Sequence, residues 1–142
     1  MYKRPESVLV VVATQGGEVL LLRRTEPPDF VQSVTGSLRW GESPRRAAMR
    51  ELWEETGLTA GPNLIDAAHR ERFPIVSPWR ARYAPWQRYN TEHWFYLVLP
   101  SRRLIRLNPR EHSEYRWLPA GRAAAAVTSW TNRDAIRALF GH

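Results

Sequence analysis

The sequence predicts a single α+β or α/β/α layered domain that spans residues 1–142. A chain of 142 residues fits one domain with a substantial hydrophobic core. Short apolar runs typical of β-strands are interleaved with two stretches typical of helices, an order that favours a sheet covered by helices. No internal repeat, low-complexity segment or linker divides the chain.

The first strands are expected to form a hairpin. Residues 7–14 (SVLVVVAT) are rich in β-branched residues, and the run is too short for a helix. Residues 15–17 (QGG) predict a turn, after which residues 18–24 (EVLLLRR) return as a second strand. Two prolines end this strand, and residues 30–34 form a short extended piece.

A helix is expected from Ser43 to Thr56. Ser43 suits the N-cap position and Pro44 the first helical position. The segment between them and Thr56 is rich in good helix formers, and Gly57 is well placed to end the helix.

The second half of the chain predicts three more strands and a final helix. The strands cover residues 64–73, 91–99 and 114–118. Residues 74–89, with three prolines and two tryptophans, are expected to form a long structured loop, and such loops are often functional. Either Ser129 or Thr131 caps the last helix, which is expected to end near residue 140.

Composition excludes several classes of protein. The chain has no cysteine, so disulfides, thiolate metal sites and a cysteine nucleophile are excluded. No apolar run approaches the roughly 20 residues of a membrane span. The apolar stretch near the start is too short for a signal peptide, and a cytoplasmic location is therefore expected.

The net charge of +7 indicates some attraction to polyanions. Lys3 is the only lysine among the 21 basic residues, and the arginines are spread along the whole chain. This spread favours a generally basic surface over dedicated nucleic-acid binding.

Three glutamates in the predicted helix point to a metal site. Glu51, Glu54 and Glu55 are spaced so that their carboxylates share one helical face. Their mutual repulsion costs about a few tenths of a kcal/mol per pair, and the C-terminal end of the helix dipole also disfavours anions. A bound Mg²⁺ ion would offset both costs. The alternative is a solvated acidic face in which Arg50 pairs with Glu54.

The residues around this cluster resemble the Nudix box. The segment GSLRWGESPRRAAMRELWEETGL matches each fixed position of that box, through Gly36, Glu42, Arg50, Glu51, Leu52, Glu54, Glu55, Gly57 and Leu58. The resemblance implies an α/β/α sandwich with a mixed β-sheet. It also implies a hydrolase that uses Mg²⁺, or Mn²⁺, to cleave a diphosphate linkage in a nucleotide-like small molecule.

The same resemblance implies roles for individual residues. Glu51 and Glu55 would be the principal metal ligands, and Glu54 would contribute or hold a metal-bound water. Gly36, which lacks a Cβ atom, would let the loop backbone approach the metal. Arg50 would orient the glutamates by charge-assisted hydrogen bonds.

Short segments outside the box resemble one branch of the family, the bacterial enzymes that hydrolyse dihydroneopterin triphosphate in folate synthesis. They include YKRP near the start, QSVTGS before the helix, RYAP and NTE in the middle, and SW with NR near the end. This resemblance implies that Glu111 binds metal or acts as a base and also contacts substrate. The other substrate contacts that it implies are Lys3, Arg23, Thr35, Phe73, Pro74, Ile75, Val76 and Ser129.

Two other functions stay open at this point. The first is Nudix hydrolysis of damaged nucleoside triphosphates or dinucleoside polyphosphates. The second is a non-catalytic module that binds nucleotide or nucleic acid, in which the tryptophans and arginines of residues 79–88 stack on bases. The oligomeric state and the exact substrate are not determined by the sequence.

Overall fold

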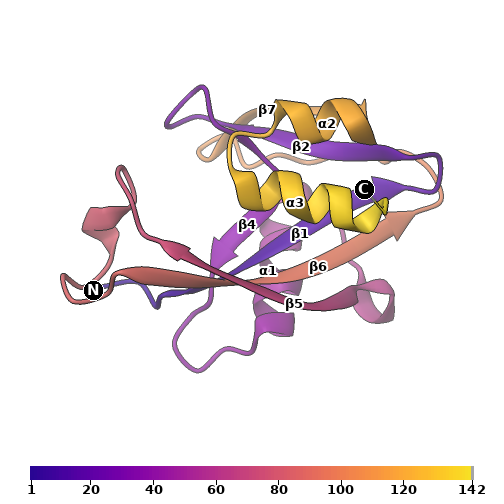
Figure 1. The fold of residues 1–142 in the computed structure, drawn as a ribbon. Helices are drawn as coiled ribbons and strands as arrows, with labels where there is room; N and C mark the ends of the chain where they lie inside the picture. The colour runs from indigo at the N-terminus through magenta and orange to yellow at the C-terminus, as the bar shows by residue number, and fades with distance from the viewer. Residues whose placement is uncertain (142) are drawn as a thin grey trace.

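The computed structural model describes residues 1–141, which form a mixed β-sheet with helices on both faces (Figure 1). The strands are β1 (Glu6–Thr14), β2 (Glu18–Arg24), β3 (Val31–Gln32), β4 (Val34–Ser37), β5 (Ile65–Pro74), β6 (Tyr89–Leu99) and β7 (His112–Pro119). The helices are α1 (Pro44–Thr56), α2 (Ala120–Ala126) and α3 (Trp130–Leu139), with short 3₁₀ turns η1 (Gly61–Asn63) and η2 (Arg80–Arg82).

The sheet is built around β1. Its main strand order is β3-β2-β1-β6-β5, with β4 also paired to β1 and β7 to β2. The β1 and β6 strands are parallel, whereas the other pairs are antiparallel. The predicted hairpin of β1 and β2 and the predicted mixed sheet are therefore confirmed.

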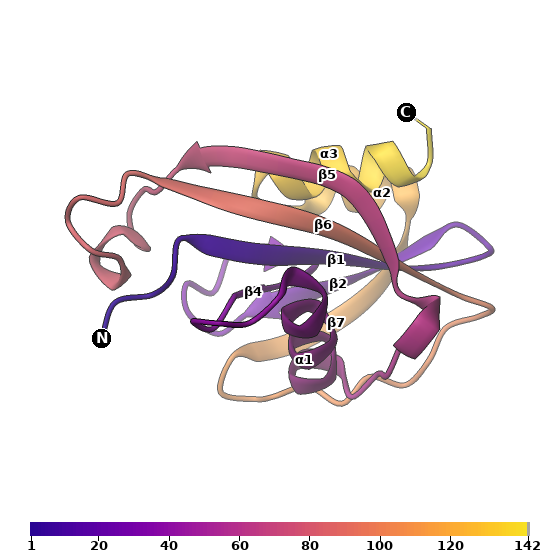
Figure 2. The ribbon, with the colours of Figure 1, turned by 90° about the horizontal axis from the view of Figure 1, so that it is seen from below.

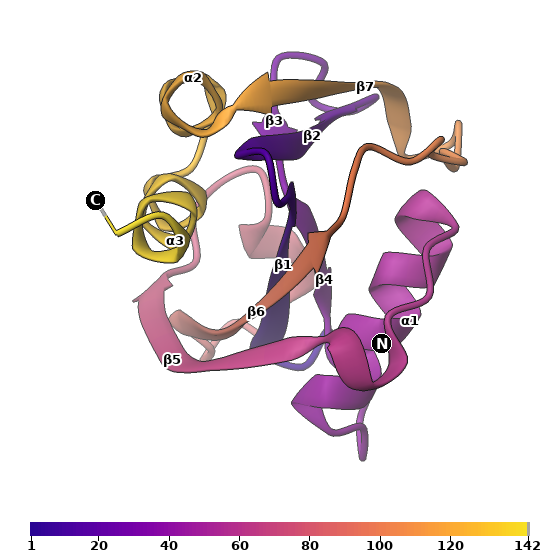
Figure 3. The same ribbon diagram turned by 90° about the vertical axis from the view of Figure 1, so that its right-hand side faces the viewer.

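Both faces of β1 are buried, which explains its unbroken apolar sequence. Val8 and Val10 belong to the core that α1 covers, together with Leu52 of that helix. Leu9 belongs to the opposite core, together with Ile136 of α3. Figures 2 and 3 show α1 on one face of the sheet and α2 with α3 on the other. This arrangement confirms the predicted α/β/α sandwich.

Helix α1 begins and ends where its capping residues predict. The Ser43 side chain accepts a hydrogen bond from the Arg46 backbone N–H, and Pro44 occupies the first turn. Gly57 follows the last helical residue with a φ of 75°, in the left-handed region that glycine tolerates best.

The remaining elements depart from the sequence predictions in two ways. The extended piece expected over residues 30–34 is two short strands, β3 and β4, and β4 continues to Ser37. Helix α2, an alanine-rich segment, was not predicted, because without long apolar side chains it has little helical periodicity. Between the two caps considered for the last helix, Ser129 is the one whose side chain accepts from the Asn132 N–H.

The loop between β5 and β6 lies beside the N-terminus (Figure 1). The Lys3 backbone N–H donates to the Arg82 carbonyl across 2.9 Å, so the first residues are tied to this loop. Among the helices of residues 1–141, none combines the length and apolar character that a membrane span requires.

Candidate active site

A cavity of about 480 Å³ brings together most of the residues that the sequence singled out. Its walls come from both ends of the chain, from the face of α1 that carries glutamates, and from the β5–β6 loop. The predicted site residues that line it are Lys3, Thr35, Gly36, Glu51, Glu55, Phe73, Pro74, Ile75, Val76, Glu111 and Ser129. Arg23, Arg50 and Glu54 are not among the lining residues.

Gly36 leaves room for the Glu51 carboxylate. A Cβ atom built on Gly36 would overlap the carboxylate carbon of Glu51, so no other residue fits here without moving that group. The backbone of Gly36 has no positive φ, and glycine is required for close approach alone. Gly36 therefore lets α1 lie directly against β4.

Glu55 is a buried carboxyl group whose cost of burial is not offset by a neighbouring positive charge in the part of the chain that the structure describes. Its side chain is 2% exposed, and its Oε1 atom has no hydrogen-bond partner among residues 1–141. Burial is the main cause that raises the pKa of Glu55 well above its ordinary value, and the neighbouring carboxylates of Glu51 and Glu111 add to the effect. A positive charge beside Glu55 would remove this penalty.

Arg50 and Glu42 form an ion-pair network next to the cavity, outside its lining. The Arg50 guanidinium donates to Glu42 at 2.8 Å and 2.9 Å and to Glu51 Oε1 at 2.6 Å. It also donates to the Ser37 carbonyl, which joins α1 to the end of β4. Its Nη1 lies 3.5 Å from the half-exposed Glu54. Arg50 thus holds the glutamate side chains in position without facing the cavity.

The carboxylates present fit a hard divalent cation. Glu51 and Glu55 face one cavity with Glu111, and the unpartnered buried oxygen of Glu55 is an available ligand of the type that Mg²⁺ prefers. Within residues 1–141, however, no three acidic or histidine side chains converge closely enough to hold an ion as they stand. Glu51 uses its Oε1 atom in an ion pair with Arg50.

Arg24, and not Arg23, faces the cavity. Arg23 pairs with Glu114 at 2.8 Å on the neighbouring strand β7, whereas Arg24 lines the cavity wall. The pairing of β2 with β7 shifts register between these two arginines. Strand alternation places Arg24 on the same face of β2 as Leu20 and Leu22, the face that α1 covers, whereas Arg23 has the facing of Leu21 in the opposite core. The cavity position predicted for Arg23 is therefore held by Arg24.

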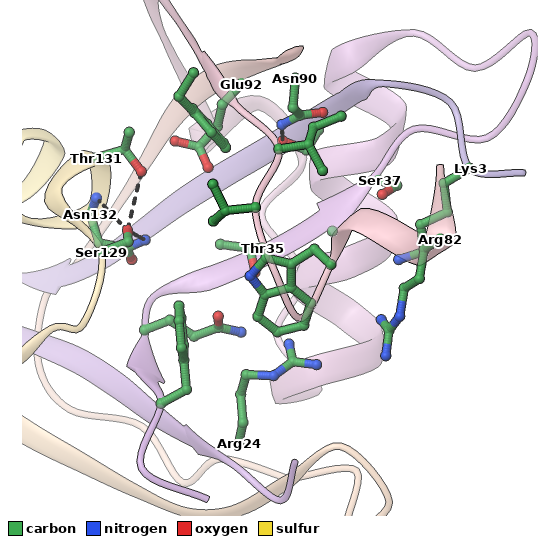
Figure 4. Close-up of a pocket in the computed structure, with 18 of the residues that line it drawn as sticks. Lys3, Arg24, Thr35, Ser37, Arg82, Asn90, Glu92, Ser129, Thr131 and Asn132 are labelled. Carbon is green, nitrogen blue, oxygen red and sulfur yellow. Dashed lines mark hydrogen bonds between the residues drawn. The ribbon is translucent and has the colours of Figure 1, made fainter. Parts of the chain in front are cut away.

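Three cationic side chains gather at one side of the cavity, as Figure 4 shows for Lys3, Arg24 and Arg82. Burial, and then repulsion by Arg82, lowers the pKa of both Lys3 and Arg24 from their usual values. The guanidinium groups of Arg24 and Arg82 lie 4.7 Å and 5.5 Å from the ring centre of Trp79. This side of the cavity is therefore suited to an anion.

The polar residues at the opposite side were missed by sequence reasoning. Asn90 and Glu92 line the cavity from β6, and Thr131 and Asn132 line it from the first turn of α3. The alternation of Asn90 and Glu92 was a usable signal, because it places two polar side chains on one face of a strand whose other residues are largely buried.

The aromatic loop does not act as one surface. Trp79 and Arg82 line the cavity, while Trp86 and Arg88 line a separate open hollow beside β5. The base-stacking surface considered for this loop is therefore split between two places.

The family model of the NUDIX domain matches residues 3–139. The chain belongs to this family. Nudix hydrolases generally use divalent metal ions, in agreement with the carboxylate cluster described above.

Similarity to individual Nudix proteins extends over nearly the whole chain. The chain is 48% identical over 140 residues to a dihydroneopterin triphosphate diphosphatase of Escherichia coli, covering 96% of this chain and 92% of that protein. It is 38% identical to the Haemophilus influenzae protein of the same name, covering 96% and 87%. The solved structure of the E. coli dihydroneopterin triphosphate pyrophosphohydrolase superposes with a TM-score of 0.91 at 47% identity, covering 97% of this chain and 96% of that one.

Proposed function

We propose that this Nudix protein hydrolyses dihydroneopterin triphosphate to dihydroneopterin monophosphate and pyrophosphate, a step of folate biosynthesis. The observation that carries the proposal is the 48% identity to an enzyme of that activity over 96% of the chain. The cavity supports it, because one side gathers cations for a triphosphate while the other offers neutral and acidic polar groups for a ring.

The phosphate chain is held by the cationic side of the cavity. Lys3 and Arg24 bind phosphate oxygens, and their lowered pKa values rise again when an anion neutralises the repulsion between them and Arg82. Thr35 adds a hydroxyl group from β4. The ring then extends toward Ser129 and the apolar residues 73–76.

The acidic residues organise the reacting phosphate. Glu51 and Glu55 would be the main ligands of Mg²⁺, or of Mn²⁺ in its place, with Glu54 and Glu111 contributing. When bound, the ion supplies charge neutralisation at the phosphates and helps to activate water. Arg50 keeps Glu51 in reach through their 2.6 Å hydrogen bond, and Gly36 admits its carboxylate.

Glu111 is the proposed acceptor of the proton from the attacking water. It lies in the loop before β7 and lines the cavity that Glu51 and Glu55 also line. Glu111→Gln should then lower kcat much more than it raises KM, the pattern of an interaction made chiefly in the transition state. A change in KM alone would make Glu111 a substrate contact instead.

The direct test is turnover by purified protein with Mg²⁺. We expect pyrophosphate as the released product, and a kcat/KM for dihydroneopterin triphosphate at least about tenfold above that for GTP or dATP, equal to roughly 1.4 kcal/mol. Release of orthophosphate would contradict the bond assignment. Equal efficiency on ordinary nucleotides would contradict the pterin substrate and leave the assignment of diphosphate hydrolysis intact.

The cytoplasmic location of the protein stays a prediction.

A further inference from the structure

The end of the cavity away from the cations contains a buried carboxyl group with no assigned role. Glu92 is 5% exposed and lies on β6, opposite Thr131 of α3 (Figure 4). The Trp94 indole N–H donates to its Oε1 atom at 3.1 Å, and the Thr131 hydroxyl also hydrogen-bonds to it. These contacts fix the carboxyl group in one orientation at the cavity wall.

Among residues 1–141, no cation compensates the Glu92 carboxyl group. Burial raises the pKa of Glu92 to about 7, and Glu71, its charged neighbour among these residues, raises it further. Fold stability gains nothing from such a group, because a buried carboxylate without a cation or full hydrogen bonding is costly. A ligand that brings hydrogen-bond donors into the cavity would satisfy it.

Asn90 presents an unsatisfied hydrogen-bond acceptor on the same strand face as Glu92. Its Nδ2 donates to the Ser7 hydroxyl at 2.7 Å, which fixes the orientation of the amide. Its Oδ1 is buried and has no hydrogen-bond partner among the described residues. Asn90 and Glu92 both line the cavity, so this end offers an amide oxygen without a donor beside a carboxyl group without a cation among residues 1–141.

A 2-amino-4-oxopyrimidine ring carries the matching donors. Its ring N3–H and its exocyclic 2-amino group are adjacent and parallel, and together they form two hydrogen bonds with one carboxylate. We propose that Glu92 is the specificity-determining residue that binds this edge of the substrate ring, with Asn90 accepting a further hydrogen bond. The proposal rests on the proposed function for the ring that is bound, and it extends to guanine, which has the same edge.

The proposal predicts that nucleotides with both donors are hydrolysed with a higher kcat/KM than nucleotides that lack one. GTP presents both donors, whereas ITP lacks the 2-amino group and leaves one carboxylate oxygen unpaired. Sites that hydrogen-bond a substrate group reject analogues lacking it far more strongly than apolar pockets do. We therefore expect wild-type kcat/KM for GTP to exceed that for ITP by at least about tenfold.

The decisive variant is Glu92→Gln. Glutamine still accepts from Trp94, but its amide N–H₂ meets the donors of the ring. We expect KM for dihydroneopterin triphosphate to rise by at least about tenfold with kcat changed only a few-fold, and the GTP-to-ITP ratio to fall toward one. Glu114→Gln is the matched control, because Glu114 is a partly exposed glutamate that pairs with Arg23 outside the cavity lining. It should keep both the KM and the GTP-to-ITP ratio of the wild type.

The outcomes separate this proposal from the proposed function. If wild-type protein prefers GTP over ITP but does not prefer the pterin, Glu92 recognition stands and the pterin assignment fails. If GTP and ITP are used alike, or if Glu92→Gln lowers kcat/KM for every substrate equally, the proposal is overturned. A measurement on wild-type protein does not depend on folding of the variant: guanosine should inhibit with a Ki several-fold below that of inosine, and equal Ki values would also overturn it.

Discussion

Several ionisable side chains in the cavity lie in surroundings that destabilise their charged forms. Burial lowers the pKa of Lys3 and raises those of Glu55 and Glu92. Groups in this state at a cavity are typical of a functional site, because substrate and cofactor supply the missing counter-charges. Glu42 shows the opposite case, since hydrogen bonds from Arg50 lower its pKa to about 2 in a structural ion pair.

The two adjacent arginines of β2 give a direct comparison. Because Arg24 faces the cavity, Arg24→Gln should raise KM about tenfold by removing a charge-assisted contact to phosphate. Arg23→Gln removes only a partly exposed pair with Glu114 and should change KM less than about twofold. Steady-state kinetics on both variants checks this, and the reverse order would return the phosphate contact to Arg23.

The buried carboxyl of Glu92 should make stability depend on pH. Its pKa is about 7 in the folded protein, above that of an exposed glutamate, so the folded state binds the proton more tightly than the unfolded state does. The free energy of unfolding therefore falls as pH rises from about 4.5 to 7, by on the order of 3 kcal/mol. Glu92→Gln should lack this loss, so its Tm advantage over wild type should be larger at pH 8 than at pH 5. A Tm difference independent of pH would contradict this prediction.

At the scale of elements, α1 contributes to the core and to the site with adjoining faces. Leu52 is fully buried against the sheet, while Glu51 and Glu55 face the cavity from the neighbouring helical positions. The cap residues fix where this helix begins and ends, and hence where its glutamates lie relative to β4.

A pair of glycine substitutions tests the end of α1. Gly57→Ala places a side chain at a φ of 75° and within 3.2 Å of the Arg106 Cβ atom, so it should destabilise the fold by about 1 kcal/mol or more. Gly121→Ala, in α2, meets no atom within 4 Å and should stabilise by about 0.5 kcal/mol. Urea unfolding measures both, and equal effects would refute the role of the Gly57 conformation.

At the scale of the whole molecule, the cavity joins segments that are far apart in sequence. Lys3 lies near one end of the chain and Ser129 near the other, yet both line the cavity. The cores on both faces of the sheet lie outside the carboxylate cluster, so the fold itself should not depend on a metal ion.

Metal removal should separate activity from folding. Chelation with EDTA should abolish turnover and leave the circular dichroism spectrum unchanged. Saturating Mg²⁺ should raise Tm by roughly 5–10 °C, because the ion binds the folded state at the glutamates. Glu55→Gln should lose most of this shift while keeping its spectrum. An equal shift in wild type and Glu55→Gln would place the ion elsewhere.

The sequence by itself determined the features whose causes are local. Ser43, Pro44 and Gly57 fix α1 through contacts within a few residues, and the apolar run of β1 marks a strand buried on both faces. The spacing of Glu51 and Glu55 follows from helical periodicity alone. These signals predicted the layered fold, the family and the acidic part of the site.

Tertiary structure decided which side chains meet across elements. Packing of α1 on the β2 face that carries Leu20 and Leu22 placed Arg24, and not Arg23, at the cavity. Pairing of β6 with its neighbours, and packing of α3 on the sheet, brought Glu92 to Thr131. Such contacts depend on strand register and on packing between distant segments. A one-residue shift in register reverses which face a side chain occupies, so local sequence patterns did not determine them.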